Sequence, residues 1–266
     1  MNFRFCSLAS GSSGNCLYIE TNTSKFLIDA GLSGKRIEIL LKGIGVSPDE
    51  LDAIFVTHEH SDHSAGVGVL ARRYDLKVFG NENTIMSMGK KLDKLFEKNI
   101  EIFSSEKSFE YRDILFTPIP LFHDASEAVG YSIEYGNKKI SIVTDTGWIS
   151  NPMKDIIRNS DIYYIEANHD EDMLKNGFYP WPLKQRILST RGHLSNEHTA
   201  NVLTELLNGK NETVILGHLS KDNNTPDIAY ETVAKILKDH KYKIEDSKDL
   251  ILKVAPRYEP TDIIEI

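Results

Sequence analysis

Short hydrophobic runs and helically spaced hydrophobic positions alternate along the chain. The runs predict strands at residues 2–7, 16–20, 25–29, 53–57, 77–80, 100–103, 114–118, 129–135, 139–143, 161–165, 213–216 and 250–254. Hydrophobic residues three and four positions apart predict helices at residues 34–45, 65–73, 83–94, 195–207 and 226–239. Because two sets of strands are each followed by helices, we expect an α/β (α+β) fold, with two sheets flanked by helices in one domain over residues 1–266.

The composition is that of an ordinary globular protein, with 40% hydrophobic and 26% charged residues. It excludes collagen, a disordered chain and a coiled coil. No stretch approaches the roughly 18 apolar residues of a transmembrane helix, so we expect no membrane insertion. The first few hydrophobic residues give way to serine and glycine, so we expect no signal peptide and a cytoplasmic location.

The net charge and the cysteine count restrict the possible binding partners and metal sites. A formal charge of −8 does not fit a general nucleic-acid binder, so any nucleic-acid contact must come from a local basic patch or from bound metal. The two cysteines, Cys6 and Cys16, are too few for a disulfide framework or a four-cysteine zinc site. We expect both to be reduced thiols in the core.

Four possible metal ligands stand within six residues, directly after the predicted strand 53–57. They are His58, His60, Asp62 and His63. A sharp loop at the end of a strand can turn the first two toward one cation and the last two toward a second. Imidazole and carboxylate ligands suit Zn²⁺, and also Mn²⁺ or Fe²⁺.

Further ligands are needed to complete two metal sites. His123, Asp145 and His218 each lie at or just beyond the end of a predicted strand. This shared position makes all three candidate ligands, although a lone histidine or aspartate there could equally be a cap or a hydrogen-bonded structural residue.

The ligand motif and the three later residues, in this order, resemble the metallo-β-lactamase superfamily. The resemblance implies a four-layer αβ/βα sandwich with two mixed β-sheets flanked by helices and with two metal ions. It implies that one ion is held by His58, His60 and His123, that the other is held by Asp62, His63 and His218, and that Asp145 bridges both.

Two further features refine the resemblance. Antibiotic-hydrolysing members usually have cysteine where this chain has Asp145, and the carboxylate resembles branches that cleave phosphodiesters, thioesters or lactones. Local matches at residues 8–15, 29–33, 166–170, 179–186, 192–196 and 218–224 resemble the YycJ/WalJ group of bacterial proteins. That resemblance implies DNA exonuclease activity directed from 5′ ends.

Such a site would use a hydroxide bridging the metals to attack phosphorus. We expect Asp62 to orient this hydroxide and His193 to protonate the leaving oxygen, with His169 as a second candidate that could contact substrate. The alternative for both histidines is a structural hydrogen bond.

Substrate contacts are predicted in residues 173–196, which contain four basic residues, three aromatic residues and no acidic residue. Basic and aromatic side chains suit a sugar-phosphate backbone and an unstacked base, so Lys184 and Arg186 are candidate contacts. A surface loop whose aromatic residues cover the core is the alternative.

The leading prediction is therefore a dinuclear metal-dependent phosphodiesterase, a 5′-end-directed DNA exonuclease with DNA as its partner and Zn²⁺, Mn²⁺ or Fe²⁺ as cofactor. The alternative is a hydrolase of a small ester, thioester, lactone or β-lactam, which would need an apolar pocket. A third class, a non-catalytic metal-bearing interaction module, has no need of two open metal sites. Protein partners are not predicted.

Overall fold

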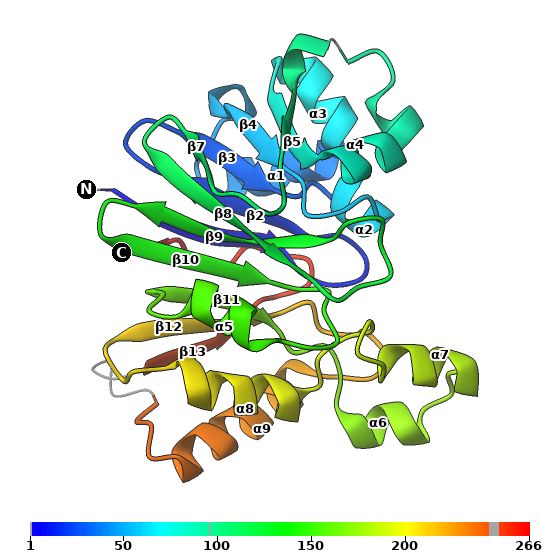
Figure 1. Ribbon diagram of the computed structural model, residues 1–266, viewed down its shortest axis with the longest axis vertical. Helices are drawn as coiled ribbons and strands as arrows, with labels where there is room; N and C mark the ends of the chain where they lie inside the picture. The colour runs from blue at the N-terminus through cyan, green and yellow to red at the C-terminus, as the bar shows by residue number, and fades with distance from the viewer. Residues whose placement is uncertain (1, 96, 245–249) are drawn as a thin grey trace. The chain divides into compact units, whose positions relative to one another are not determined.

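The computed structural model describes residues 2–95, 97–244 and 250–266, which form two mixed seven-stranded sheets flanked by helices (Figure 1). The first sheet has the strand order β14-β1-β2-β3-β4-β5-β6 and the second has the order β13-β12-β11-β10-β9-β8-β7. The predicted fold class, two mixed sheets with flanking helices, is confirmed.

The strands of the first sheet are β1 (Arg4–Ala9), β2 (Cys16–Glu20), β3 (Lys25–Ile28), β4 (Ala53–Phe55), β5 (Lys77–Asn81), β6 (Ile100–Phe103) and β14 (Ile264–Glu265). The strands of the second are β7 (Phe109–Tyr111), β8 (Ile114–Pro120), β9 (Val129–Tyr135), β10 (Lys138–Val143), β11 (Ile162–Glu166), β12 (Glu212–Gly217) and β13 (Leu250–Val254). Strands β3 to β6 run parallel, as do β10 to β13. Strand β1 pairs antiparallel with β2 and with β14, and the pairs β2–β3, β7–β8 and β9–β10 are also antiparallel.

The helices are α1 (Gly34–Gly43), α2 (Ser61–Ser64), α3 (Val67–Tyr74), α4 (Glu82–Met88), α5 (Asn151–Ile157), α6 (Glu171–Asn176), α7 (Trp181–Ile187), α8 (Asn196–Leu206) and α9 (Pro226–Asp239). Ser195 caps α8, since its hydroxyl accepts a hydrogen bond from the backbone N–H of His198, and Pro226 begins α9.

The described residues group into two compact units. Unit 1 takes its residues from Met1–Pro118, Ala125–Val129 and Pro256–Ile266, and unit 2 takes its residues from Ile119–Asp124 and Gly130–Ala255. Each unit has its own hydrophobic core. The expectation of one domain over residues 1–266 stays a prediction.

In unit 1, the sheet has different neighbours on its two faces. Leu27, Ile54 and Val78 from three adjacent strands share a core with residues of α1 and α3. Because successive side chains of a strand point to opposite faces, the neighbouring residues Phe55 and Phe79 lie on the other face, where their rings stack with centroids 4.5 Å apart. This arrangement leaves the ends of the strands to carry polar residues.

In unit 2, α5, α8 and α9 bury their apolar sides against strands β10 to β13 (Figure 1). Leu203 of α8 and Val233 of α9 are completely buried in this core with Val214 of β12. Alternating burial along α8 and α9 follows the helical spacing of their hydrophobic residues, as the sequence predicts.

The structure differs from the predicted elements where segments are short. The predicted helix 83–94 ends at Met88, because Gly89 has a positive φ of 44° and a 3₁₀ helix, Gly89–Leu92, follows. Strands β7 and β14 and helices α5, α6 and α7 were not predicted, since none is longer than seven residues and hydrophobic spacing says little over such lengths.

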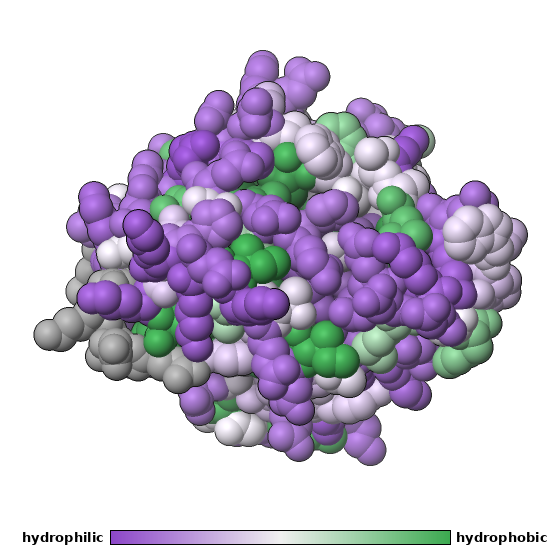
Figure 2. All heavy atoms as spheres, turned by 90° about the horizontal axis from the view of Figure 1, so that it is seen from below, coloured by the Kyte–Doolittle hydropathy of each residue, from purple (hydrophilic) through white to green (hydrophobic). Residues whose placement is uncertain are grey.

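Cys6 and Cys16 are buried free thiols on β1 and β2, which confirms the prediction of reduced core cysteines. Among the described residues, no helix combines the length and the apolar character that crossing a membrane requires. The face of the molecule in Figure 2 is mostly hydrophilic, with small separate hydrophobic areas.

Candidate metal centre

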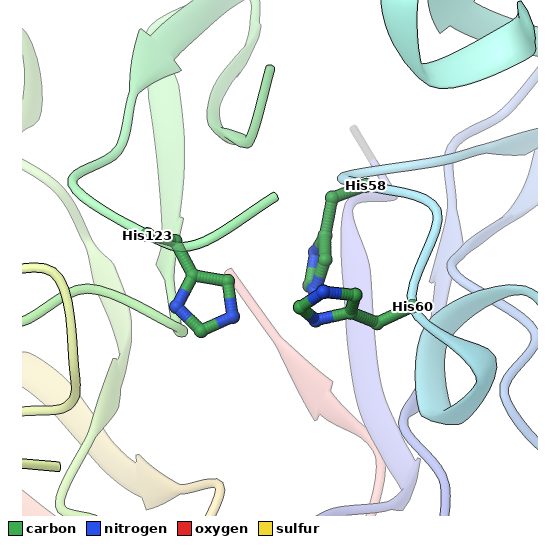
Figure 3. Close-up of side chains that lie close together, drawn as sticks. All are labelled: His58, His60 and His123. Atoms are coloured by element: carbon green, nitrogen blue, oxygen red, sulfur yellow. The ribbon is translucent and has the colours of Figure 1, made fainter. Parts of the chain in front are cut away.

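Unit 1 brings the four candidate ligands of the contiguous motif together in the loop after β4 and in the short helix α2. His58 lies in that loop, His60 is the N-cap of α2, and Asp62 and His63 lie within α2. The rings of His58 and His60 have centroids 4.7 Å apart and planes inclined at 76° (Figure 3). The rings of His58 and His63 have centroids 4.2 Å apart. The structure therefore places these histidines as the sequence predicts, at the end of a buried strand.

A buried aspartate fixes the orientation of two of these rings. Asp29 accepts hydrogen bonds from the backbone N–H of Thr57 at 2.8 Å and from Nδ1 of His63 at 2.7 Å. The Thr57 hydroxyl donates to Asp29 at 2.8 Å, so its oxygen can accept from Nδ1 of His58 at 3.0 Å. With Nδ1 carrying the proton in both rings, Nε2 is the nitrogen that can bind a metal ion.

The motif loop is also pressed closely against the segment after β3. A Cβ atom at Gly31 would lie 1.6 Å from the carbonyl oxygen of Asp62, so only glycine fits there. The backbone N–H of Asn15 donates to that oxygen at 2.7 Å, and the N–H of Ala30 donates to the carbonyl of His63 at 2.8 Å. The side-chain amide of Asn15 lies 3.0 Å from Nε2 of His63. The backbone of two sequence-distant turns thus holds the ligand loop.

Unit 2 holds the remaining predicted ligands, which come from separate strand ends. His123 follows β8, Asp145 follows β10 and His218 follows β12. Oδ1 of Asp145 lies 3.7 Å from Nε2 of His123 and 3.5 Å from Nε2 of His218. All three residues are buried. Asp145 and His218 have positive φ angles of 60° and 53°, a backbone conformation that non-glycine residues adopt mainly at constrained sites.

Glu166, the last residue of β11, orients two histidines in this unit. Its Oε1 lies 2.7 Å from Nδ1 of His193 and 2.8 Å from Nδ1 of His218, and its side chain is completely buried. Its Oε2 accepts weaker hydrogen bonds from the backbone N–H groups of Thr146 and Leu194. Potential ligand atoms of Asp145, Glu166, His193 and His218 lie within 4.8 Å of one another.

The charges around Glu166 are mutually dependent. Burial raises the pKa of the Glu166 carboxyl, but the two histidines outweigh burial and bring this pKa down to about 2. The two effects act in the opposite directions on His193. Burial lowers the pKa of its ring, and the negative charge of Glu166 raises this pKa by more, so that the pKa lies above its ordinary value. Burial also lowers the pKa of His123.

His169 is not among the described residues whose potential ligand atoms lie together. The backbone of His169 accepts a hydrogen bond from the N–H of Asn196 at 2.9 Å, and Nδ1 lies 3.4 Å from Oδ1 of Asn168. The side chain is buried, and Nε2 has no hydrogen-bond partner among the described residues. Burial lowers the pKa of His169 to about 4, so the ring is neutral at neutral pH.

The predicted substrate contacts fall into two kinds. Lys184 is buried, and its Nζ donates to the carbonyls of Lys175 at 2.8 Å and Gly177 at 2.6 Å, so it supports the turn between α6 and α7. Arg186 is exposed and pairs with Asp124 at 2.7 Å. Direct contact of either residue with a substrate stays a prediction.

Two aromatic side chains of the segment 173–196 are exposed to solvent. Phe178 is 80% exposed and Trp181 is 61% exposed, which argues against the alternative that these two rings cover the core. Tyr179 differs, because its hydroxyl donates to Asp222 at 2.8 Å.

The donor sets of both units fit a divalent metal ion. They offer imidazole nitrogens and carboxylate oxygens with no cysteine among the grouped residues. Four of the histidines, His58, His63, His193 and His218, have Nδ1 held by hydrogen bonds. These donors suit zinc, manganese and iron alike.

Sequence reasoning missed the roles of Asp29, Thr57 and Glu166. A signal was present, because Asp29 and Glu166 are acidic residues at the ends of buried strands, where a charged side chain needs a partner. What the sequence did not contain was the identity of the histidines that they contact.

The comparisons with known proteins agree with this geometry. The model of the metallo-β-lactamase superfamily matches residues 9–218. The chain belongs to the metallo-β-lactamase superfamily. The crystal structure of the metallo-β-lactamase fold protein YhfI from Bacillus subtilis aligns over 100% of both chains with a TM-score of 0.74 at 15% identity. The predicted family and its fold are therefore confirmed.

Two relatives are much more similar in sequence. Exodeoxyribonuclease WalJ of Streptococcus pneumoniae is 45% identical over 239 residues, which cover 89% of each protein. Exodeoxyribonuclease YycJ of Bacillus anthracis is 39% identical over 250 residues, which cover 94% of this chain and 95% of the relative. The predicted resemblance to the YycJ/WalJ group is confirmed.

Proposed function

We propose that this chain is a metal-dependent exodeoxyribonuclease that degrades DNA from its 5′ ends. The observation that carries the proposal is the similarity, over 89% and 94% of the chain, to two proteins named exodeoxyribonucleases. The orientation of histidines by buried carboxylates in both units supports a metal-dependent reaction. A cytoplasmic location, where cellular DNA and reduced thiols would be found, is part of the proposal.

The proposed metal ligands come from both units. One divalent ion would be held by His58, His60 and His123, the second by Asp62, His63 and His218, and Asp145 would bind both. Zn²⁺ is our first choice, with Mn²⁺ or Fe²⁺ compatible with the same donors. When bound, the ions would supply positive charge to the phosphate and activate a water molecule for attack on phosphorus.

The protein's own groups would then position the reactants and move protons. Asp62, with a side chain that is 26% exposed, can accept a hydrogen bond from the attacking water. His193, with a side chain that is 17% exposed, can donate a proton to the leaving oxygen, while Glu166 holds its ring through Nδ1.

Residues 173–196 would bind the DNA strand. Phe178 and Trp181 expose their rings for stacking on unpaired bases, and Arg186 can reach a phosphate if it exchanges Asp124 for the ligand. We propose Lys184 as part of this surface, acting at least through the turn that it supports. The unpartnered Nε2 of His169 makes that ring a further candidate for contact with substrate.

A cleavage assay tests the proposal. Protein loaded with Zn²⁺ or Mn²⁺ is incubated with single- and double-stranded DNA labelled at the 5′ or the 3′ end, with RNA of the same sequence alongside. We expect strands labelled at the 5′ end to release labelled mononucleotides at the earliest time points, and strands labelled at the 3′ end to shorten progressively. Asp145→Ala should give neither product.

Protein with two bound metal ions that cleaves no DNA would contradict the proposal. A panel containing an ester, a thioester, a lactone and a β-lactam would then test the alternative hydrolase activity on the same site.

A further inference from the structure

The back of the unit 1 ligand loop is held by a lysine that sequence analysis does not single out. Lys91 lies in the 3₁₀ helix Gly89–Leu92, about thirty residues after the loop in sequence. Its Nζ donates to the carbonyl oxygen of Glu59 at 2.6 Å and to the hydroxyl oxygen of Ser64 at 2.6 Å. One ammonium group thus ties together the two ends of the segment 59–64, which contains three of the proposed ligands.

The serine at the far end continues this set of contacts. Oγ of Ser64 lies 2.7 Å from the carbonyl oxygens of both Glu59 and His60, so its hydroxyl can donate back to the start of the loop. Ser64 is completely buried. Its hydroxyl can therefore accept from Lys91 and donate to the loop backbone at the same time.

The side chain of Glu59 is held from another direction. Its Oε1 accepts hydrogen bonds from the backbone N–H and from the hydroxyl of Ser126, both at 2.9 Å. The Ser126 hydroxyl also lies 2.7 Å from the hydroxyl of Ser87 in α4. Glu59, which stands between two histidines of the motif, thus serves as the attachment point of the loop rather than as a ligand.

The position of Lys91 itself is fixed by close packing. A Cβ atom at Gly68 of α3 would lie 1.8 Å from the carbonyl oxygen of Lys91, so the 3₁₀ helix lies directly against α3. Burial lowers the pKa of Lys91, while Glu59 and Asp62 act in the opposite direction. Its neighbour Lys90 is exposed, so the two lysines, although adjacent in sequence, have different surroundings.

We propose that Lys91 is a positioning residue for the metal ligands of unit 1, acting through Glu59 and Ser64 on the backbone that carries His60, Asp62 and His63. The proposal rests on the proposed function, because it assumes that these residues bind metal. Loss of a hydrogen bond to a ligand side chain typically weakens metal affinity by about 10- to 100-fold. Lys91 acts one step further away, on the backbone that carries the ligands, so we expect an effect near the lower end of that range.

The test compares Lys91→Met with Lys90→Met. Lys91→Met keeps most of the side-chain volume and removes the donors, and Lys90→Met makes the same change at an exposed position. The Zn²⁺ affinity of each metal-free protein is measured by competition with a chromogenic chelator, and thermal unfolding of the same metal-free samples is recorded. We expect Lys91→Met to weaken Zn²⁺ binding at least tenfold and Lys90→Met to leave it unchanged.

Equal Zn²⁺ affinities for Lys91→Met and wild type would overturn the proposal, even if the unfolding temperature falls, because a merely structural lysine would change stability alone. If Lys91→Met does not fold, Ser64→Ala carries the same expectation and the same contradicting result. The variant His60→Ala distinguishes failure of the proposed ligand set from failure of the role of Lys91. If His60→Ala binds Zn²⁺ as tightly as wild type, the proposed ligand set is wrong. If His60→Ala loses Zn²⁺ affinity and Lys91→Met does not, only the role of Lys91 is wrong.

Discussion

The two units orient their candidate metal-binding histidines in different ways. In unit 1 the candidate ligands are neighbours in sequence, and Asp29 reaches one ring directly and another through Thr57. In unit 2 they come from separate strand ends, and Glu166 alone contacts two rings. Each unit thus uses one buried carboxylate for two rings, but in unit 1 backbone hydrogen bonds from Asn15 and Ala30 also hold the contiguous candidate ligands.

The comparison predicts that unit 2 is more sensitive to loss of its orienting carboxylate. Glu166→Gln keeps the shape but removes the negative charge that both His193 and His218 contact. We expect DNA cleavage to slow by about 100-fold or more, since each orienting contact is typically worth about 10- to 100-fold in activity or metal affinity. Steady-state cleavage rates at saturating Zn²⁺ measure the effect.

Glu212→Gln is the matched control for that variant. Glu212 is also a buried carboxylate of unit 2, but it accepts hydrogen bonds from the backbone N–H groups of Asn208 and Lys210 and contacts no histidine in the described structure. Similar rates for the two variants would mean that burial of a carboxylate, and not orientation of histidines, determines the outcome.

The corresponding change in unit 1 should have a smaller effect. Asp29→Asn can still accept from the N–H of Thr57, but it loses the charge beside His63. We expect Zn²⁺ affinity to fall by about tenfold, measured by chelator competition. Asp52→Asn is the control, because Asp52 accepts a backbone N–H from Lys25 and pairs with Arg112 away from the ligand loop. A larger loss of Zn²⁺ affinity from Asp29→Asn than from Glu166→Gln, with both variants measured by chelator competition, would reverse the comparison.

The surface of residues 173–196 should affect DNA binding more than the rate of the chemical step. Arg186→Ala removes one exposed positive charge, so we expect weaker DNA binding and a salt dependence reduced by about one unit of slope in a log–log plot. Binding is measured by fluorescence anisotropy at several salt concentrations with the Asp145→Ala background. Lys235 is an exposed lysine of α9, and Lys235→Ala should leave the salt dependence of DNA binding unchanged. If the background protein, Arg186→Ala and Lys235→Ala all have the same salt dependence, Arg186 is not part of the binding surface.

The smallest expected difference concerns helix capping. Ser195 caps α8 from a buried position, whereas Ser33 caps α1 from an exposed one. We expect Ser195→Ala to lower the free energy of unfolding by about 1 kcal/mol, and Ser33→Ala to lower it by less, because water replaces an exposed hydroxyl at little cost. Urea unfolding of both variants measures this, and an equal loss would show that burial of the cap is irrelevant.

The sequence predicts features formed by neighbouring residues better than features formed by residues far apart in the chain. The clustering of the candidate ligands in the motif 58–63 could be predicted because these residues are contiguous and follow a strand of continuous hydrophobic residues. His123, Asp145 and His218 could be proposed only because each follows a recognisable strand. Long elements such as α9 were predicted with their bounds, since fourteen residues carry several repeats of the helical spacing.

The remainder depends on three-dimensional contacts that have no local signal. Lys90 and Lys91 are adjacent and chemically alike, yet Lys90 is exposed while Lys91 donates to Glu59 and Ser64. Lys184 was predicted from its charge and lies buried against two carbonyls. In both cases, the fold decides whether an ammonium group faces water or backbone oxygens.

The central claim is that bound divalent metal ions enable cleavage of DNA ends. The most direct measurement titrates Zn²⁺ into metal-free protein and records, in the same samples, the metal bound per chain and the rate of release of 5′-terminal nucleotides. We predict that cleavage appears as the second ion binds, and that His60→Ala and Asp145→Ala each abolish the second half of the titration. Cleavage at full rate by metal-free protein, or by either variant, would contradict the account.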